Sequence, residues 1–275
     1  MIIDPHLHVW SDDEERYPFP GGKPPEGGGS VELLNETMSS AGVDKAVIVQ
    51  PKQSLFDNRY VADCLEQFPG KFAAVGLVDP TTPDAPDRLE ELVVEHGFGG
   101  MRLHLGRYGP PSVLATPDQN PLWQMAEKLG ACILLLGYEE EYAALEPIVS
   151  RFPQVNVVFD HLAAVPANEV APYPLLNILL RFAQYPNVYV KVSNVCHRSE
   201  EPYPHRDTFP MIHQVYDAFG PERLMWGSDF PHVIRPGATG YVESLDLIRK
   251  EIDFFTEEDL EWILCKTIQK IWQFD

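Results

Sequence analysis

The chain has 275 residues, 44% of them hydrophobic and 11% aromatic, so it is long enough to bury a large core and is not an intrinsically disordered protein. Its 41 acidic and 21 basic residues give a formal net charge of −20, which repels phosphate backbones and anionic lipids and excludes nucleic acid and membrane surfaces as expected partners. The longest apolar run, residues 131–136, is too short to span a bilayer.

Cysteine usage and the first residues predict a cytoplasmic protein. The cysteines are scattered and form no C-x-x-C pair, which indicates reduced thiols rather than disulfides or a zinc finger. The chain begins without the basic and apolar segments of a signal peptide. A homo-oligomer is compatible with this composition, which does not fix the oligomeric state.

Short apolar runs alternate with segments of helical periodicity along the chain. We predict strands at residues 1–9, 45–50, 72–78, 99–105, 131–137, 155–161, 188–193 and 223–228. We predict helices at residues 31–41, 87–96, 121–129, 141–152, 175–184, 209–219 and 242–252, and a last helix from residue 256. Ser30 is expected to cap the first helix, and Thr256 and Asp259 to form a capping box.

The strands are mostly apolar on both faces, which indicates a parallel sheet covered on both sides. At this length the pattern predicts an α/β fold in which residues 1–275 form a single-domain (β/α)₈ TIM barrel with an additional C-terminal helix. A doubly wound open sheet is the alternative. In both folds ligands bind at the carboxyl ends of the strands, so the residues there indicate the function.

The first strand, IDPHLHVW at residues 2–9, carries polar side chains where a buried strand should be apolar. Strand alternation would place Asp4, His6 and His8 on one face and Ile3 and Leu7 on the other. Polar side chains in a strand covered on both sides need partners, a metal or a cavity. The H-x-H pair projects two imidazoles in parallel, close enough to share one cation.

Later strand ends supply groups that complete such a site. His161 follows the sixth strand and Asp229 follows the eighth. Three histidines and a carboxylate are the donors of a catalytic zinc site, and alternatively Asp229 is the base that activates water. The structural alternatives are that Asp229 caps a helix and that His161 is a core histidine. Asp4 would either orient a histidine or simply tie down the first strand.

Candidate substrate-binding side chains also lie at or beside strand ends: Gln50, Arg102, His104, Lys191 and His232. Arg102 suits bidentate binding of a carboxylate, and a structural pair with a nearby acid is equally compatible with its position. Lys191 would contact the substrate or pair with an acid such as Asp160.

Five segments together resemble the motifs of the amidohydrolase superfamily: DPHLHVW, GMRLHL, FDHLA, VKVS and WGSDFPH. They resemble in particular the branch of lactone hydrolases that includes 2-pyrone-4,6-dicarboxylate lactonase, sulfomuconolactone hydrolase and L-fuconolactonase. The resemblance runs in register from the first predicted strand to the eighth, so it covers nearly the whole chain.

The resemblance implies roles for the matching residues. His6 and His8 match the family's first-strand pair, His161 its later histidine, and Asp229 the aspartate that acts as general base. Arg102 matches a basic residue that binds carboxylated substrates in such enzymes. Binuclear members use a carboxylated lysine on the fourth strand and a histidine on the fifth, and this chain has neither, so a two-metal site is not expected. Members of the lactonase branch work with one divalent metal or with none.

The resemblance is to the amidohydrolase-related, metal-dependent type of hydrolase. Together with the residues at the strand ends, it predicts a hydrolase that opens a small, carboxylated lactone by Asp-activated water. At most one divalent ion, Zn²⁺ or similar, would be held by His6, His8, His161 and Asp229, and metal-independent catalysis stays open. The expected partner is a small anionic substrate. The alternatives are a metal-dependent decarboxylase of an unsaturated or aromatic acid and a non-catalytic ligand-binding barrel.

Overall fold

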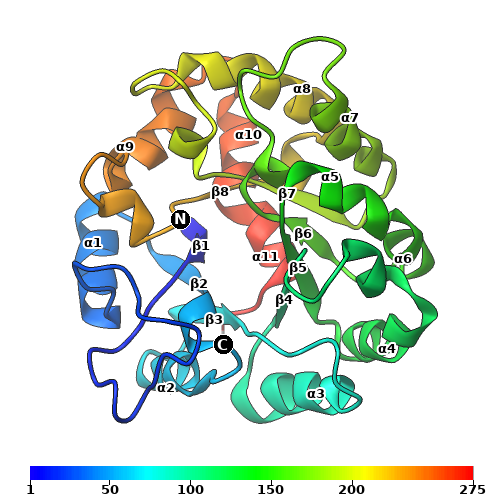
Figure 1. The fold of residues 1–275 in the computed structure, drawn as a ribbon. Coiled ribbons are helices and arrows are strands. Elements are labelled where there is room, and N and C mark those ends of the chain that lie inside the picture. The colour runs from blue at the N-terminus through cyan, green and yellow to red at the C-terminus, as the bar shows by residue number, and fades with distance from the viewer. Residues whose placement is uncertain (275) are drawn as a thin grey trace.

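The computed structural model describes residues 1–274 and shows eight parallel strands surrounded by helices (Figure 1). The strands are β1 (Ile3–Leu7), β2 (Lys45–Val49), β3 (Phe72–Val75), β4 (Gly100–His104), β5 (Cys132–Leu136), β6 (Val157–Phe159), β7 (Val188–Ser193) and β8 (Leu224–Gly227). They pair in chain order, β1 to β3 in one sheet and β4 to β8 in another. The predicted α/β fold with parallel strands is confirmed.

Backbone hydrogen bonds join the two sheets at both edges. Gly76 N, just after β3, donates to Gly100 O of β4 at 3.0 Å, and His8 N, just after β1, donates to Phe230 O beyond β8 at 2.7 Å. The order of strands therefore follows the chain all the way round, whereas a doubly wound sheet reverses its order at a switch point. All strands present their carboxyl ends on the same side of the ring.

The helices are α1 (Val31–Ala41), α2 (Arg59–Gln67), α3 (Ala85–His96), α4 (Asn120–Leu129), α5 (Glu139–Tyr142), α6 (Glu146–Arg151), α7 (Pro174–Arg181), α8 (Phe209–Phe219), α9 (Tyr241–Asp246), α10 (Glu257–Glu261) and α11 (Thr267–Ile271). The helices from α1 to α9 lie outside the strands in Figure 1, whereas α10 and α11 lie across the centre of the ring. Ser30 accepts from Leu33 N, and Thr256 and Asp259 cap each other, as predicted. The sequence prediction omitted α2, although Val61 and Cys64 have helical spacing and are both buried.

Strand β1 departs from simple alternation because its register with β2 shifts between Asp4 and Leu7. Ile3 packs in the interior of the ring, whereas Asp4 accepts hydrogen bonds from Ser228 N at 3.0 Å and from Tyr241 Oη at 2.9 Å. The predicted common face of Asp4 with His6 and His8 is therefore wrong. Asp4 ties β1 to the residues after β8 instead.

The core has two parts, one between the strands and the helices and one inside the ring. Inward-facing strand residues such as Ile3 and Leu134 pack inside the ring against Ile268, Ile271 and Trp272. The C-terminal segment that contains α10 and α11 (red in Figure 1) thus packs against the interior of the ring. Within residues 1–274, no helix is both long and apolar enough to cross a membrane.

Candidate active site

Four side chains predicted to act together converge at the carboxyl ends of β1, β6 and β8. His6 Nε2 and His8 Nε2 lie 3.6 Å and 3.5 Å from the same atom, Oδ1 of Asp229. The ring of His161 lies 4.5 Å from the ring of His6, measured between centroids. All four side chains are buried, so they form one desolvated cluster around the Asp229 carboxylate.

Unusual backbone conformations position two members of this cluster. Asp229 has φ 60°, and His161 with φ 54° begins a run of left-handed residues that ends at Ala164. Each such non-glycine residue costs about 1–2 kcal/mol, which persists only where the surrounding structure fixes it. A small residue is also needed beneath His6, because a Cβ on Gly227 would lie 2.8 Å from Cβ of His6.

Hydrogen bonds fix the far side of two site histidines. His8 Nδ1 lies 2.7 Å from the carbonyl oxygen of Val49, which can only accept, so His8 carries a proton on Nδ1. His161 Nδ1 lies 2.8 Å from Oγ of Ser193, a residue of the VKVS motif on β7. Partners of this kind hold an imidazole at a fixed angle, and both leave Nε2 available to the site.

Asp160 lies beneath the cluster and organises three buried groups. Its Oδ2 accepts from Arg102 Nε at 2.8 Å, and its Oδ1 lies 3.0 Å from Lys191 Nζ and 3.2 Å from His6 Nδ1. Burial acts to raise the pKa of Asp160, but the nearby charges, that of Lys191 foremost, hold it well below its usual range. Asp160 is therefore ionised and anchors the residues around it.

The electrostatic environment keeps the Asp229 carboxylate charged and the imidazoles of His161 and His104 neutral. Burial alone would raise the pKa of Asp229, but the neighbouring histidines, His161 first among them, lower it below its ordinary value. Burial lowers the pKa of His161 to about 4 and that of His104 to about 2. At neutral pH the site thus combines the ionised Asp229 with the neutral imidazole of His161, protonation states that are suited to general base catalysis.

A pocket of about 440 Å³ opens above this cluster at the carboxyl ends of the strands. Among the described residues that line it, Asp229 is the one acidic side chain. The basic and imidazole side chains of its wall are Lys52, Arg102, Arg198, His8, His104, His161, His197 and His232. The pocket is therefore positive in a protein whose net charge is −20, which favours an anionic ligand.

The predicted substrate-binding residues divide into two groups. Arg102, His104 and His232 line the pocket, and His104 Nε2 has no hydrogen-bond partner among the described residues. Gln50 does not line it, because its side chain is turned to Asp57 O at 2.7 Å and holds the loop after β2. Lys191 is fully buried against Asp160, the geometry of the ion-pair alternative rather than of a substrate contact.

Sequence reasoning missed Arg198, which follows β7. Its Nη1 donates to Ala164 O at 2.6 Å, while its Nε is buried without a partner in the described part of the chain. The only signal in the sequence was a basic residue in the loop after a strand end. That signal is weak because a loop residue can point into the pocket or into solvent.

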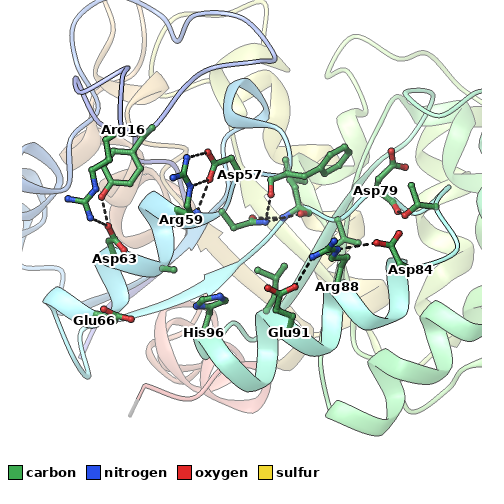
Figure 2. Close-up of a pocket in the computed structure, with 18 residues that line it drawn as sticks. Arg16, Asp57, Arg59, Asp63, Glu66, Asp79, Asp84, Arg88, Glu91 and His96 are labelled. Atoms are coloured by element: carbon green, nitrogen blue, oxygen red, sulfur yellow. Dashed lines mark hydrogen bonds and ion pairs between the residues drawn. The ribbon is translucent and has the colours of Figure 1, made fainter.

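A second hollow, of about 580 Å³, lies beside α2 and α3 away from the cluster (Figure 2). Three ion pairs, Arg16–Asp63, Arg59–Asp57 and Arg88–Asp84, neutralise part of its charge. The remaining acidic side chains of its lining, Glu66, Asp79 and Glu91, leave it negative. It brings together no histidine–carboxylate cluster among residues 1–274. The smaller, positive pocket above Asp229 is therefore the better candidate for an active site.

The cluster also fits one divalent cation. Ligand atoms of His6, His161 and Asp229 lie within 4.8 Å of one another, and so do those of His8, Asp229 and His232. His6 Nε2 is buried and has no hydrogen-bond partner among the described residues. Imidazole nitrogens with one carboxylate are donors that zinc accepts, at bond lengths of about 2.0–2.2 Å. The residues could thus bind a single metal ion.

Comparisons with known proteins find distant relatives over most of the chain. L-fucono-1,5-lactonase of Burkholderia ambifaria is 27% identical over 238 residues, which cover 83% of this chain and 80% of that protein. The 4-sulfomuconolactone hydrolase of Hydrogenophaga intermedia is 24% identical over 236 residues, which cover 83% and 74% of the two chains. Both relatives are distant, and both are named for reactions of lactones.

Solved structures and a family model extend the similarity over the whole chain. A probable 2-pyrone-4,6-dicarboxylic acid hydrolase of Acinetobacter baumannii, with citric acid bound, superposes with a TM-score of 0.84, 22% identity and 98% coverage of both chains. An amidohydrolase of Burkholderia multivorans with bound zinc has a TM-score of 0.77, 20% identity and the same coverage of both chains. The family model described as amidohydrolase matches residues 3–274. The chain therefore belongs to the amidohydrolase family.

Proposed function

We propose that this chain is a single-domain (β/α)₈-barrel hydrolase that opens a small, carboxylated lactone with a water activated by Asp229. The observation that carries the proposal is the surroundings of Asp229: a carboxylate with a lowered pKa lies beside a positive pocket and is ringed by His6, His8 and His161. The names of the distant relatives point to the same class of substrate.

In the proposed reaction, Asp229 removes a proton from water as the water oxygen attacks the lactone carbonyl carbon. The carbonyl oxygen gains negative charge, and imidazole N–H groups of the cluster stabilise it. The ring C–O bond then breaks, and the proton held by Asp229 passes to the leaving oxygen. The product is an open-chain acid that carries one more carboxylate than the substrate.

The same donors are suited to a divalent ion such as Zn²⁺. Such an ion would be held by His8, His161 and Asp229, and by His6 if its Nε2 carries no proton, and would polarise the lactone carbonyl as a Lewis acid. Without it, Asp229 still serves as the base, and an imidazole whose Nε2 carries the proton serves as the hydrogen-bond donor, so the proposal does not depend on a metal.

The basic side chains in the wall of the pocket indicate that the proposed substrate is negatively charged. The Nε atom of Arg198 has no hydrogen-bond partner among residues 1–274, and Lys52 and Arg102 lie in the same wall. Arginine binds carboxylates through two parallel hydrogen bonds, which fixes the orientation of a ring substituent. We therefore propose a small anion as the partner, and neither nucleic acid nor a membrane.

A panel of lactones assayed with wild type and Asp229→Asn tests the proposal, with metal content measured by elemental analysis. The variant should lose turnover while keeping its circular dichroism spectrum. Asp118→Asn is the matched control, because it makes the same chemical change on an exposed residue outside the pocket. Ring opening that survives Asp229→Asn, or release of carbon dioxide without ring opening, would reject the proposal.

A further inference from the structure

The hydrogen-bond partner of His6 Nδ1 determines whether the other ring nitrogen, Nε2, carries a proton. Nδ1 makes a hydrogen bond with Lys191 Nζ at 3.0 Å. Asp160 Oδ1 is also near, at 3.2 Å, yet this oxygen is aligned with no hydrogen-bond donor among the described residues. Distance alone would allow either partner, but only the approach of Lys191 has the direction of a hydrogen bond.

A lysine ammonium group can donate hydrogen bonds but cannot accept one. The bond from Lys191 therefore requires a lone pair on His6 Nδ1. A neutral imidazole carries one proton, so that proton must be on Nε2. Nε2 is the atom that faces the site, 3.6 Å from Oδ1 of Asp229.

The geometry points to Lys191 as a positioning residue that keeps His6 in its Nε2–H tautomer. His6 then presents a hydrogen-bond donor to the site, whereas a metal ligand must present a lone pair. His8 has the opposite arrangement, since its Nδ1–H is bound to the Val49 carbonyl and its Nε2 faces Asp229. The two histidines of the H-x-H motif thus present different groups to the site, an N–H on His6 and a lone pair on His8.

The location of Lys191 makes this arrangement hard to change. Its side chain is completely buried, between the Asp160 carboxylate and the ring of Trp272, whose centroid lies 5.6 Å from Nζ. Burying an ammonium group is unfavourable unless it is paired and hydrogen-bonded. If Lys191 turned away from His6, it would lose this hydrogen bond in a place that water does not reach.

The consequence concerns metal binding. With a proton on His6 Nε2, a divalent ion would have to displace that proton and turn Nδ1–H toward Asp160, against the bond from Lys191. Lys191 thus lowers the affinity of the cluster for zinc and leaves His6 free to donate to a developing oxyanion. The donation to an oxyanion rests on the proposed lactone hydrolysis. The tautomer does not, because it is a property of the free protein.

Nitrogen-15 NMR of the imidazole rings in the metal-free wild-type protein tests the tautomer directly, with His6→Gln identifying the signals of His6. We expect a protonated Nε2 and an unprotonated Nδ1. An unprotonated Nε2 on His6 overturns the inference. This readout does not need a substrate, so failure of the lactone assays would reject the proposed function and leave the tautomer standing.

The variant Lys191→Met removes the donor and keeps most of the side-chain volume. In it, the His6 proton should move to Nδ1 and point to Asp160, and zinc affinity measured by calorimetry should rise by about 10–100-fold, the range over which partners of metal-bound histidines act. Ser193→Ala, which alters the partner of His161, should leave the His6 signals unchanged. An unchanged tautomer in Lys191→Met would overturn the inference, and if that variant does not fold, the wild-type spectrum decides.

Discussion

Arg102 Nε donates to Asp160 Oδ2 at 2.8 Å, and both side chains are almost completely buried. Asp160 faces the ammonium group of Lys191 as well, so a single carboxylate compensates two buried cations. Removing one member of such a group leaves the others uncompensated in a medium that solvates them poorly.

We therefore expect Asp160→Asn to lower the free energy of unfolding by about 3–5 kcal/mol, as when a buried ion pair is broken. Urea denaturation measures the change. The comparison is Asp84→Asn, which removes an exposed partner of Arg88 and should have a far smaller effect. Equal effects of the two substitutions would show that the buried charges are solvated in a way that the structure does not suggest.

Gly227→Ala should disturb catalysis through His6. The added Cβ would lie 2.8 Å from Cβ of His6, closer than carbon atoms approach, so His6 must leave its present position beside Asp229. Gly220→Ala is the control for general destabilisation. A Cβ on Gly220 would meet no described atom within 4 Å, but it would strain the backbone, which has φ 70° there. Thermal unfolding should show both variants destabilised, and only Gly227→Ala should lose lactone turnover beyond its loss of folded protein.

Asp4 should make the stability of the protein depend on pH. Burial raises its pKa from 3.8 to about 6. The folded state therefore holds this proton more tightly than the unfolded state, and stability falls as pH rises from 3.8 through about 6. A shift of about 2 pKa units corresponds to at most about 3 kcal/mol, which is fully expressed above the folded pKa.

Asp4→Asn mimics the protonated form and tests this prediction. Denaturation at about pH 4, 5 and 8 should show variant and wild type similar at the lowest pH and the variant progressively more stable above it. A constant difference across this range would mean that Asp4 titrates normally in the folded protein.

Arg198 should act mainly on substrate binding. A charge-assisted hydrogen bond contributes about 1.5–3 kcal/mol, so Arg198→Gln should lower kcat/KM for an anionic lactone by about 10–150-fold, chiefly through KM. Arg16→Gln, in the second hollow shown in Figure 2, should leave both constants unchanged. If Arg198→Gln lowered kcat/KM for a neutral lactone as much as for the anionic one, this result would contradict a carboxylate-binding role.

Truncation of Trp272 should destabilise the interior of the ring. The side chain is almost wholly buried among inward-facing strand residues, and Trp272→Ala should cost about 3–5 kcal/mol. Trp262→Ala is the control, since Trp262 is only half-buried beneath two lysine side chains. Chemical denaturation measures the free energy of unfolding of both variants. If the C-terminal segment were only loosely attached, both substitutions would lower it by a small amount.

Much of this arrangement could be predicted because strand ends converge in any parallel barrel-like fold. The short apolar runs located all eight strands, and the positions of His6, His161 and Asp229 at or near the ends of their strands were enough to expect one cluster. The charges of the pocket were partly predictable for the same reason, since Arg102 and His104 lie on one face of β4.

Other features depend on contacts that local sequence does not encode. The register shift in β1 reversed the expected face of Asp4, and it arises from pairing with β2. Lys191 has the position of a substrate ligand, yet Asp160 and Trp272 enclose it. Arg198 reaches the pocket because a left-handed turn presents Ala164 O to it, and single residues give no sign of that turn.

The packing of Trp272 inside the ring has a consequence for how the protein reaches its native state. Ile3 and Trp272 are partners in the same interior, although most of the chain separates them. Contacts of such high contact order are made late and slowly, because a long loop must close first. Until they form, Lys191 remains open to water beneath the site, so the unusual proton arrangement at His6 is a property that only the fully assembled protein acquires.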